Sequence, residues 1–279
     1  MAGTLYIVAT PIGNIEEITA RALEVLTKVD LIAAEDTRTT KLMFNIMGMK
    51  SPKITAYHKF NEVKKQDTVI NELLADKNVA LVSEAGTPCI SDPGYYLVNA
   101  AVKAGINVRG VSGPCAAITA LSVSGFPAEP FTFLGFLPKK KQDILKITGT
   151  LSGTVVFYES PKRIIETTAI LAEQFPNADV CLCNDMSKQY ELTYRGAPRD
   201  VLTQLNENPH AEKGEYTCVI NIKLGDNADG DASAPSFESL LIDCMVKNGC
   251  DLKTAIKTLS ADYPKNELYA ASLKLKELL

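Results

Sequence analysis

The stretch TLYIVATPIGNIEEITARALEVLTKVDLIAAEDTR, residues 4–38, decides the fold class of this sequence. It predicts an apolar strand at Leu5–Ala9, a helix at Ala20–Lys28 and a second apolar strand at Leu31–Ala34. A strand, a crossover helix and a strand make a βαβ unit, in which the two strands run parallel. Because both strands are apolar throughout instead of alternating, we expect a parallel sheet that helices cover on both faces.

The same rhythm continues to residue 111. We expect further helices at Arg38–Met47, Glu62–Ala75 and Tyr95–Ala104, and further strands at Ile54–Ala56, Val79–Val82 and Ile106–Val111. These elements predict an N-terminal α/β domain, which we assign to residues 1–114.

A second α/β domain is expected at residues 115–225. It opens with a helix at Cys115–Ser122 and continues with strands at Phe131–Leu134, Thr154–Phe157 and Val180–Cys183. The segment Gly214–Leu224 alternates apolar and polar residues, which predicts an antiparallel strand with one wetter face and therefore a mixed sheet.

Residues 226–236 are small and polar and predict a linker, whereas 237–279 have helical periodicity punctuated by Asp251 and Pro264. The predicted fold is α/β, with a parallel-sheet N-terminal domain, a mixed-sheet C-terminal domain and a small C-terminal helical appendage.

Composition excludes several classes of protein. The 279 residues are 46% hydrophobic and 22% charged, which is typical of a globular protein of about two domains. The N-terminus has no basic stretch of a signal peptide, no run is long enough to span a membrane, and seven scattered cysteines fit reduced thiols, so we predict a cytoplasmic protein.

With two histidines far apart and no CxxC pair, we predict no metal site. The 33 acidic and 29 basic residues mean that any nucleic acid must meet a local basic patch.

Turn-rich segments follow the ends of four predicted strands. They are ThrProIleGlyAsn at residues 10–14, GluAspThrArg at 35–38, SEAGTPCISDPG at 83–94 and SerGlyProCysAla at 112–116. In an open parallel sheet the carboxyl ends of the strands form the edge where ligands bind, so we expect the four loops to meet at one crevice. The twelve-residue loop at 83–94 has the length and composition of a binding loop.

Common nucleotide and hydrolase motifs are absent from the sequence. It has no G-x-G-x-x-G after the first strand, no G-x-x-x-x-G-K-[ST] and no G-x-S-x-G. These absences disfavour a dinucleotide oxidoreductase, a P-loop NTPase and an α/β-hydrolase.

Six motifs in order give the sequence a family resemblance over nearly its whole length. They are ATPIGN with an IleThrXaaArgAla run (9–22), AAEDTR (33–38), HisLysPheAsnGlu (58–62), SEAGTPCISDPG (83–94), GFLP (135–138) and FYESPKR (157–163). Together they resemble the tetrapyrrole methylase superfamily and, within it, the ribosomal RNA small-subunit methyltransferase I branch.

The resemblance implies two α/β domains with S-adenosylmethionine in the cleft between them, in a homodimer. It also implies 2′-O-methylation of a cytidine ribose in the decoding region of 16S rRNA, in the small ribosomal subunit. Carried over by position, the cofactor-binding residues are Pro11, Ile12, Glu84, Ala85, Gly86, Thr87, Ile90, Cys115, Ala116 and Tyr158.

The chain departs from the branch in the long loop and in the run AsnAspMetSerLys at residues 184–188, where the branch has a run similar to ArgGluLeuThrLys. Glu84 stands where the branch has Asp, and Cys89 where it has Gly. An Arg-Glu pair is replaced by Asn184 and Asp185, which puts the polar network of that strand in question.

Methyl transfer to a hydroxyl needs orientation of the reactants and a positioned base. Our candidate catalytic residues are Glu159 and Lys188, with Glu84 as a structural or cofactor-orienting acid. Ser160 and Pro161 are expected to begin a helix that carries Lys162 and Arg163. The RNA-contacting rim is predicted to comprise Lys139, Lys140, Lys141, Lys162, Arg163 and Arg195.

Two other functions stay open at this point. One is a methyltransferase for a porphyrin or corrin precursor, which needs a wide apolar cleft and no lysine run. The other is a catalytically silent homologue that binds the ribosome, which the altered residues 184–185 make conceivable.

Overall fold

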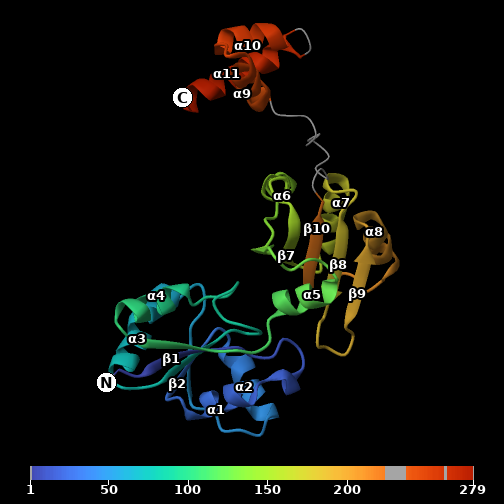
Figure 1. The fold of residues 1–279 in the computed structure, drawn as a ribbon. Helices are drawn as coiled ribbons and strands as arrows, with labels where there is room; N and C mark the ends of the chain where they lie inside the picture. Colours follow the sequence, from blue (N-terminus) through green and yellow to red (C-terminus); the bar gives the residue numbers. More distant parts are fainter. Residues whose placement is uncertain (1, 224–236, 261–262, 279) are drawn as a thin grey trace. The chain divides into compact units, whose positions relative to one another are not determined.

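The computed structural model of this chain describes residues 2–223, 237–260 and 263–278 (Figure 1). The chain forms two compact units, Met1–Lys223 and Leu224–Leu279. The predicted linker at 226–236 and the end of the second predicted domain, 224–225, lie outside the described residues. The first unit contains two sheets, and we call the parts built on them the first half and the second half.

The first half is a parallel sheet in the order β3-β2-β4-β1-β5. Its strands are β1 (Thr4–Val8), β2 (Leu31–Ala34), β3 (Lys53–Ala56), β4 (Val79–Val82) and β5 (Asn107–Val111). The helices between them are η1 (Ile15–Glu17), α1 (Ala20–Lys28), α2 (Thr37–Ile46), α3 (Glu62–Leu74) and α4 (Tyr95–Lys103). The predicted parallel sheet is therefore confirmed, with element ends within two residues of those expected.

Helices cover both faces of this sheet because alternate strand residues point to opposite sides. Ile32 and Ala80 pack in one core with residues of α1 and α2, whereas Leu31 and Leu81 pack in another with residues of α3 and α4. The inner strands β2 and β4 are apolar throughout for this reason, whereas the edge strands β3 and β5 carry Lys53 and Arg109.

The second half is a mixed sheet in the order β6-β7-β10-β8-β9, in which only β6 and β7 pair in parallel. Its strands are β6 (Phe131–Phe136), β7 (Gly153–Glu159), β8 (Asp179–Asn184), β9 (Leu192–Gly196) and β10 (Tyr216–Ile222). Its helices are α5 (Ala116–Ser124), α6 (Lys141–Thr148), α7 (Ile164–Gln174) and α8 (Pro198–Glu207). One face packs against α6, α7 and α8, and the other against α5.

Two expectations about the second half are wrong. The strand β10 has no wetter face, because it lies in the middle of the sheet and α5 covers the side of Thr217 and Val219, both of which are buried. The helix after β7 begins at Ile164, not at Pro161, since residues 161–163 form a turn in which the Arg163 N–H donates to the Ser160 carbonyl at 2.9 Å.

The second unit contains three helices among its described residues, α9 (Phe237–Asn248), α10 (Leu252–Leu259) and α11 (Lys265–Leu278). Asp251 caps α10, since its carboxylate accepts a hydrogen bond from the Thr254 N–H at 2.8 Å. Leu241, Leu268 and Leu275 lie in a small core of their own. The predicted helical segment thus has its own core, and Asp251 and Pro264 immediately precede helices.

Candidate active site

The loops that follow β1, β2, β4 and β5 meet at one pocket of about 820 Å³ in the first unit. Hydrogen bonds join these loops to one another. Thr10 and Gly86 exchange two backbone hydrogen bonds of 2.9 and 3.0 Å, and the Thr87 hydroxyl donates to the Pro114 carbonyl at 3.0 Å. The Glu84 N–H donates to the Glu35 carboxylate at 3.3 Å. The predicted convergence of the strand-end loops is confirmed, and the pocket has the size of small-molecule sites, which measure about 300–1,000 Å³.

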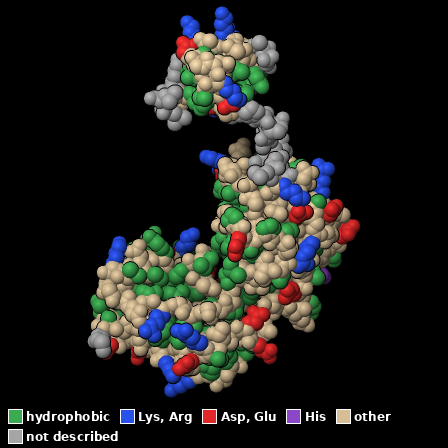
Figure 2. Space-filling view, viewed as in Figure 1, with side chains coloured by type: hydrophobic (Ala, Val, Ile, Leu, Met, Phe, Trp, Pro, Cys, Tyr) green, Lys and Arg blue, Asp and Glu red, His purple; other side chains and the backbone are tan. Residues whose placement is uncertain are grey.

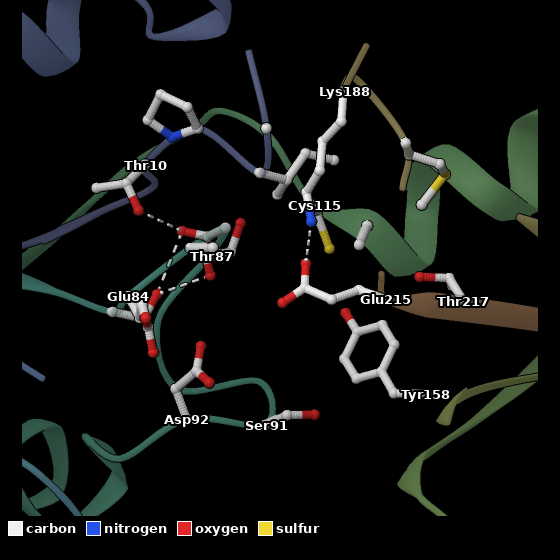
Figure 3. A pocket seen from close by; sticks show the side chains of 18 of the residues that line it. Thr10, Glu84, Thr87, Ser91, Asp92, Cys115, Tyr158, Lys188, Glu215 and Thr217 are labelled. Atoms are coloured by element: carbon white, nitrogen blue, oxygen red, sulfur yellow. Dashed lines mark hydrogen bonds and ion pairs between the residues drawn. The ribbon is translucent and has the colours of Figure 1, made fainter. Parts of the chain in front are cut away.

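Residues of the second half form the opposite wall of the pocket. Figure 3 shows Glu84 and Asp92 on one side of the open space and Tyr158, Glu215 and Lys188 on the other. Tyr158 belongs to β7, Lys188 lies in the loop after β8, and Glu215 immediately precedes β10. The pocket therefore combines loops of the first sheet with strand ends of the second.

The pocket brings together every residue that the sequence suggested for cofactor binding and catalysis. Its lining includes Pro11, Ile12, Glu84, Ala85, Gly86, Thr87, Ile90, Cys115, Ala116, Tyr158, Glu159 and Lys188. None of the six predicted RNA-contacting residues, all of which are described, lines it. Their placement outside the pocket is compatible with a rim.

The long loop after β4 contains three residues with a positive φ, Gly86, Cys89 and Gly94. Gly86 has a φ of +78°, a region that favours glycine, and a Cβ at this position would lie 3.4 Å from Ile12 Cγ2. Cys89 adopts a φ of +67° although it has a side chain. The half-buried thiol lies under Gly94, and burial raises the pKa of Cys89 to about 11. The loop thus keeps a shape suited to glycine at a position where this chain has cysteine.

The carboxylate of Glu159 is fully buried and engaged on both oxygens. Oε1 accepts a hydrogen bond from the Ser160 N–H at 2.7 Å and lies 3.3 Å from Arg163, and Oε2 accepts one from the Thr167 hydroxyl at 2.7 Å. Arg163 in turn donates to the carbonyls of Leu137 and Pro138. These contacts tie the turn after β7 to α7 and to the end of β6.

Lys188 belongs to a network of charged groups on the second wall. Its ammonium donates to the carboxylate of Asp185 at 2.8 Å and to the carboxylate of Glu215 at 2.8 Å, and Figure 3 shows the second of these contacts. Although burial favours the neutral amine, these two hydrogen bonds raise the pKa of Lys188, so it is a cation at neutral pH. In the apo pocket Lys188 is therefore a hydrogen-bond donor.

Asn184 and Asp185, two residues that we expected to depart from the branch, hold the segment that carries Glu215 in place. The Asn184 amide donates to the carbonyls of Lys213 and Glu215 at 3.1 and 3.4 Å. The Asp185 N–H donates to the Glu215 carbonyl at 3.0 Å, and the Glu215 N–H donates to the Asp185 carboxylate at 3.2 Å. A Cβ on Gly214 would lie within 2.7 Å of all three Asp185 carboxylate atoms, so only glycine fits there. The polar network that the sequence put in question is present.

Acidic groups outnumber basic ones in the pocket. The ionisable side chains in its lining, apart from Cys and Tyr, are Glu35, Glu84, Asp92, Glu159, Asp185, Glu215 and Lys188. Burial and the mutual repulsion of neighbouring carboxylates raise the pKa values of Glu35 and Asp92. Such a pocket favours a cationic ligand and disfavours phosphate.

The sequence did not single out Glu35, Asp92 or Glu215 as site residues. Glu35 and Asp92 lie in strand-end loops that it had marked, so their acidic character was the available signal. Glu215 carried no signal, because its partner Lys188 lies 27 positions away in the chain.

Residues 4–201 match the family of Tetrapyrrole (Corrin/Porphyrin) Methylases. The chain belongs to the tetrapyrrole methylases. Within the family, the "Ribosomal RNA small subunit methyltransferase I" of Escherichia coli O157:H7 is 41% identical over 98% of this chain and 95% of its own length. The protein of that name from Bacillus subtilis is 36% identical over 96% of this chain and 94% of its own.

Solved structures of tetrapyrrole methylases and their relatives have the same fold. Diphthine synthase superposes with a TM-score of 0.59 at 12% identity, covering 78% of this chain and 90% of its own. A uroporphyrin-III C-methyltransferase from Thermus thermophilus superposes with a TM-score of 0.55 at 20% identity, covering 78% and 94%. The predicted fold class is confirmed.

This tetrapyrrole methylase is an S-adenosylmethionine-dependent methyltransferase. The pocket suits that cofactor chemically. Ile12, Ala116 and Tyr158 offer apolar surface, and Glu35 and Asp92 offer negative charge to a sulfonium and an ammonium. Among the residues that the structure describes, no group of three or more His, Cys, Asp or Glu could hold a metal ion, and no helix has the length and apolarity to cross a membrane.

Proposed function

We propose that this methyltransferase methylates the 2′-hydroxyl of a cytidine in the decoding region of 16S rRNA, in the small ribosomal subunit and in the cytoplasm. The near full-length likeness to proteins named ribosomal RNA small subunit methyltransferase I supports this substrate. The observation that carries the proposal is a pocket with two chemically different walls, one of strand-end loops and one built around Lys188.

We assign the cofactor to the wall of strand-end loops. Pro11, Ile12 and residues 84–87 with Ile90 would hold it from the first half, and Cys115, Ala116 and Tyr158 from the second. Bound S-adenosylmethionine supplies an activated methyl group, and its transfer leaves a neutral thioether. The main task of the chain is then to orient the acceptor oxygen, which is worth roughly 7–11 kcal/mol of the barrier.

We assign the acceptor ribose to the wall that carries Lys188. As a cation bound to two carboxylates, Lys188 would donate a hydrogen bond that orients the ribose. The Glu215 side chain is 76% exposed and faces the pocket, and Lys188 binds its Oε2; its other oxygen, Oε1, would accept the proton of the 2′-hydroxyl as the oxygen–carbon bond forms. Glu159, our other catalytic candidate, is more suited to positioning, because its carboxylate already accepts two hydrogen bonds.

The RNA backbone would meet a small basic rim beside the pocket. Three of its lysines are exposed, namely Lys139, Lys140 and Lys162. Arg163 donates hydrogen bonds to the carbonyls of residues 137 and 138, and these bonds hold the segment of Lys139 and Lys140 next to the segment of Lys162. Lys141 pairs with Glu173, and Arg195 donates to the Val123 carbonyl. On the face drawn in Figure 2, lysine and arginine lie scattered among acidic side chains, so the rim would act locally.

The acidity of the pocket disfavours a porphyrin or corrin precursor as the substrate. Such precursors carry several carboxylates, which Glu35, Glu84, Asp92 and Glu215 would repel. A ribose is uncharged and avoids this cost.

We further propose a homodimer, in agreement with the family resemblance. The N-terminal ends of α3 and α4 lie together, since the Glu62 carboxylate accepts the Gly94 N–H, and they expose Phe60, Val63, Tyr95 and Tyr96. Exposed apolar patches of this kind mark interaction surfaces. Light scattering on wild type and on Val63→Glu tests this interface. We expect wild type to be a dimer and Val63→Glu to be a monomer, and a monomeric wild type would contradict the proposed dimer.

Labelled S-adenosylmethionine tests the substrate. The protein is incubated with small ribosomal subunits that lack the modification or with tetrapyrrole precursors, and the labelled nucleotide is mapped. We expect label on one cytidine ribose of 16S rRNA. Label on the precursor would replace the proposed substrate, and label on neither would favour the catalytically silent homologue.

A further inference from the structure

An aromatic side chain lies exposed at the mouth of the pocket. Phe136, the last residue of β6, lines the pocket and yet keeps 64% of its surface exposed. Its ring lies 5.5 Å from that of Tyr158, which also contacts Phe133 at 5.2 Å. Tyr158 thus supports Phe136 from within the pocket, while a large part of the phenyl ring is open to an incoming group.

An irregularity in the pairing of β6 with β7 directs the Phe136 side chain toward the pocket. The pairing of β6 with β7 shifts register between Phe133 and Phe136, so that Phe136 lies opposite Tyr158. Gly135, inside the shift, has a φ of +64°, and a Cβ there would lie 3.5 Å from the Ser91 hydroxyl of the long loop. Bulges next to active sites commonly re-aim a side chain. The backbone therefore keeps this phenyl ring at the pocket mouth instead of in the core.

The charges of the pocket determine which part of an RNA could enter. Glu35, Glu84, Asp92 and Glu215 face it, and Lys188, the lysine in its lining, is already bound to two carboxylates. A phosphate would be repelled, whereas a nucleoside turned out of the RNA carries no charge. Proteins that read unpaired RNA stack such bases on aromatic side chains.

We propose that Phe136 stacks on the nucleobase of the nucleotide whose ribose is methylated. This inference rests on the proposed RNA substrate and adds the residue that receives the base. With the base on Phe136, the ribose lies on the side of Lys188 and Glu215.

Substitutions at Phe136 separate stacking from simple bulk. Phe136→Ala should lower kcat/KM for unmodified small subunits by about 10-fold, in line with the loss of one base–aromatic contact. Phe136→Tyr should keep near wild-type activity because it keeps the ring, whereas Phe136→Leu, which keeps apolar bulk without a ring, should resemble alanine. Phe131→Ala, at the other end of the same strand and outside the pocket lining, is the matched control and should leave kcat/KM unchanged.

Cofactor binding and size are measured on the same variants. All should bind S-adenosylmethionine with wild-type affinity in calorimetry and have the wild-type mass in light scattering. Equal activity of the Ala, Leu and wild-type proteins would overturn the inference while leaving the RNA substrate intact. A loss of cofactor affinity or a changed mass in Phe136→Ala would also overturn it, since Phe136 would then support the cofactor wall or a subunit contact. If wild type itself does not label the RNA, it is the proposed function that fails.

Discussion

The two walls of the pocket are built in different ways. The wall of strand-end loops is held by backbone hydrogen bonds, such as the pair between Thr10 and Gly86, and by left-handed residues in the loop after β4. The opposite wall is held by side chains, with Lys188 bound to Asp185 and Glu215. A backbone-built wall tolerates changes of side chain but not of backbone shape, whereas the side-chain wall is sensitive to single charges. Glu84 and Cys89, which we expect to depart from the branch, belong to the first wall, whereas Asn184 and Asp185 belong to the second, where they are part of the hydrogen-bond network.

The largest effect is expected on the side-chain wall. Glu215→Gln removes the proposed proton acceptor and should lower kcat for RNA methylation by about 100-fold, the low end of the range for a lost general base. Affinity for S-adenosylmethionine should not change, because we assign the cofactor to the other wall. Single-turnover methylation and calorimetry measure the two quantities. A variant with wild-type kcat would remove Glu215 from the chemistry.

The next largest effect is expected on the backbone-built wall. Gly86→Ala places a side chain at a φ of +78°, which costs about 1–2 kcal/mol, and should weaken binding of S-adenosylmethionine by about 10-fold. The control is Ala85→Ser, a neighbouring substitution that requires no unusual backbone conformation, and it should bind S-adenosylmethionine with wild-type affinity. Unchanged affinity in Gly86→Ala would mean that the shape of this loop does not hold the cofactor.

A smaller effect should appear in the pH dependence of binding. Burial raises the pKa values of Glu35 and Asp92, so these carboxyls take up protons at a higher pH than ordinary acids and lose their charge as the pH falls. Affinity for the cationic cofactor should therefore drop several-fold between about pH 8 and pH 5, and affinity for the product, which lacks the sulfonium charge, should drop less. The double variant Glu35→Gln, Asp92→Asn should flatten the difference. Parallel profiles for cofactor and product in wild type would show that these acids do not face the sulfonium.

The smallest effect is expected at Cys89. Its φ of +67° is strained for a residue with a side chain, so Cys89→Gly should raise the free energy of unfolding by up to about 1 kcal/mol, partly offset by the lost packing of the thiol. Methylation activity should stay at the wild-type level. Urea unfolding measures the stability, and a loss of more than about 1 kcal/mol would show that the thiol packing outweighs the strain.

The sequence predicted the loop wall better than the side-chain wall, for a physical reason. Parallel strands bring their carboxyl ends to one edge, so local patterns at residues 10–14 and 83–94 were enough to place those loops together. The contact between Lys188 and Glu215 depends on how β8 pairs with β10, which no local pattern encodes. The burial of β10 on both faces was missed likewise, because α5, which covers Thr217, comes from a distant part of the chain.

The most direct test of this division of labour is one set of titrations of S-adenosylmethionine into wild type, Gly86→Ala and Glu215→Gln, followed by calorimetry. We expect one cofactor bound per chain in wild type, the same affinity in Glu215→Gln and about 10-fold weaker binding in Gly86→Ala. Full affinity in Gly86→Ala together with lost affinity in Glu215→Gln would place the cofactor on the wall of Lys188 and contradict the assignment of the two walls.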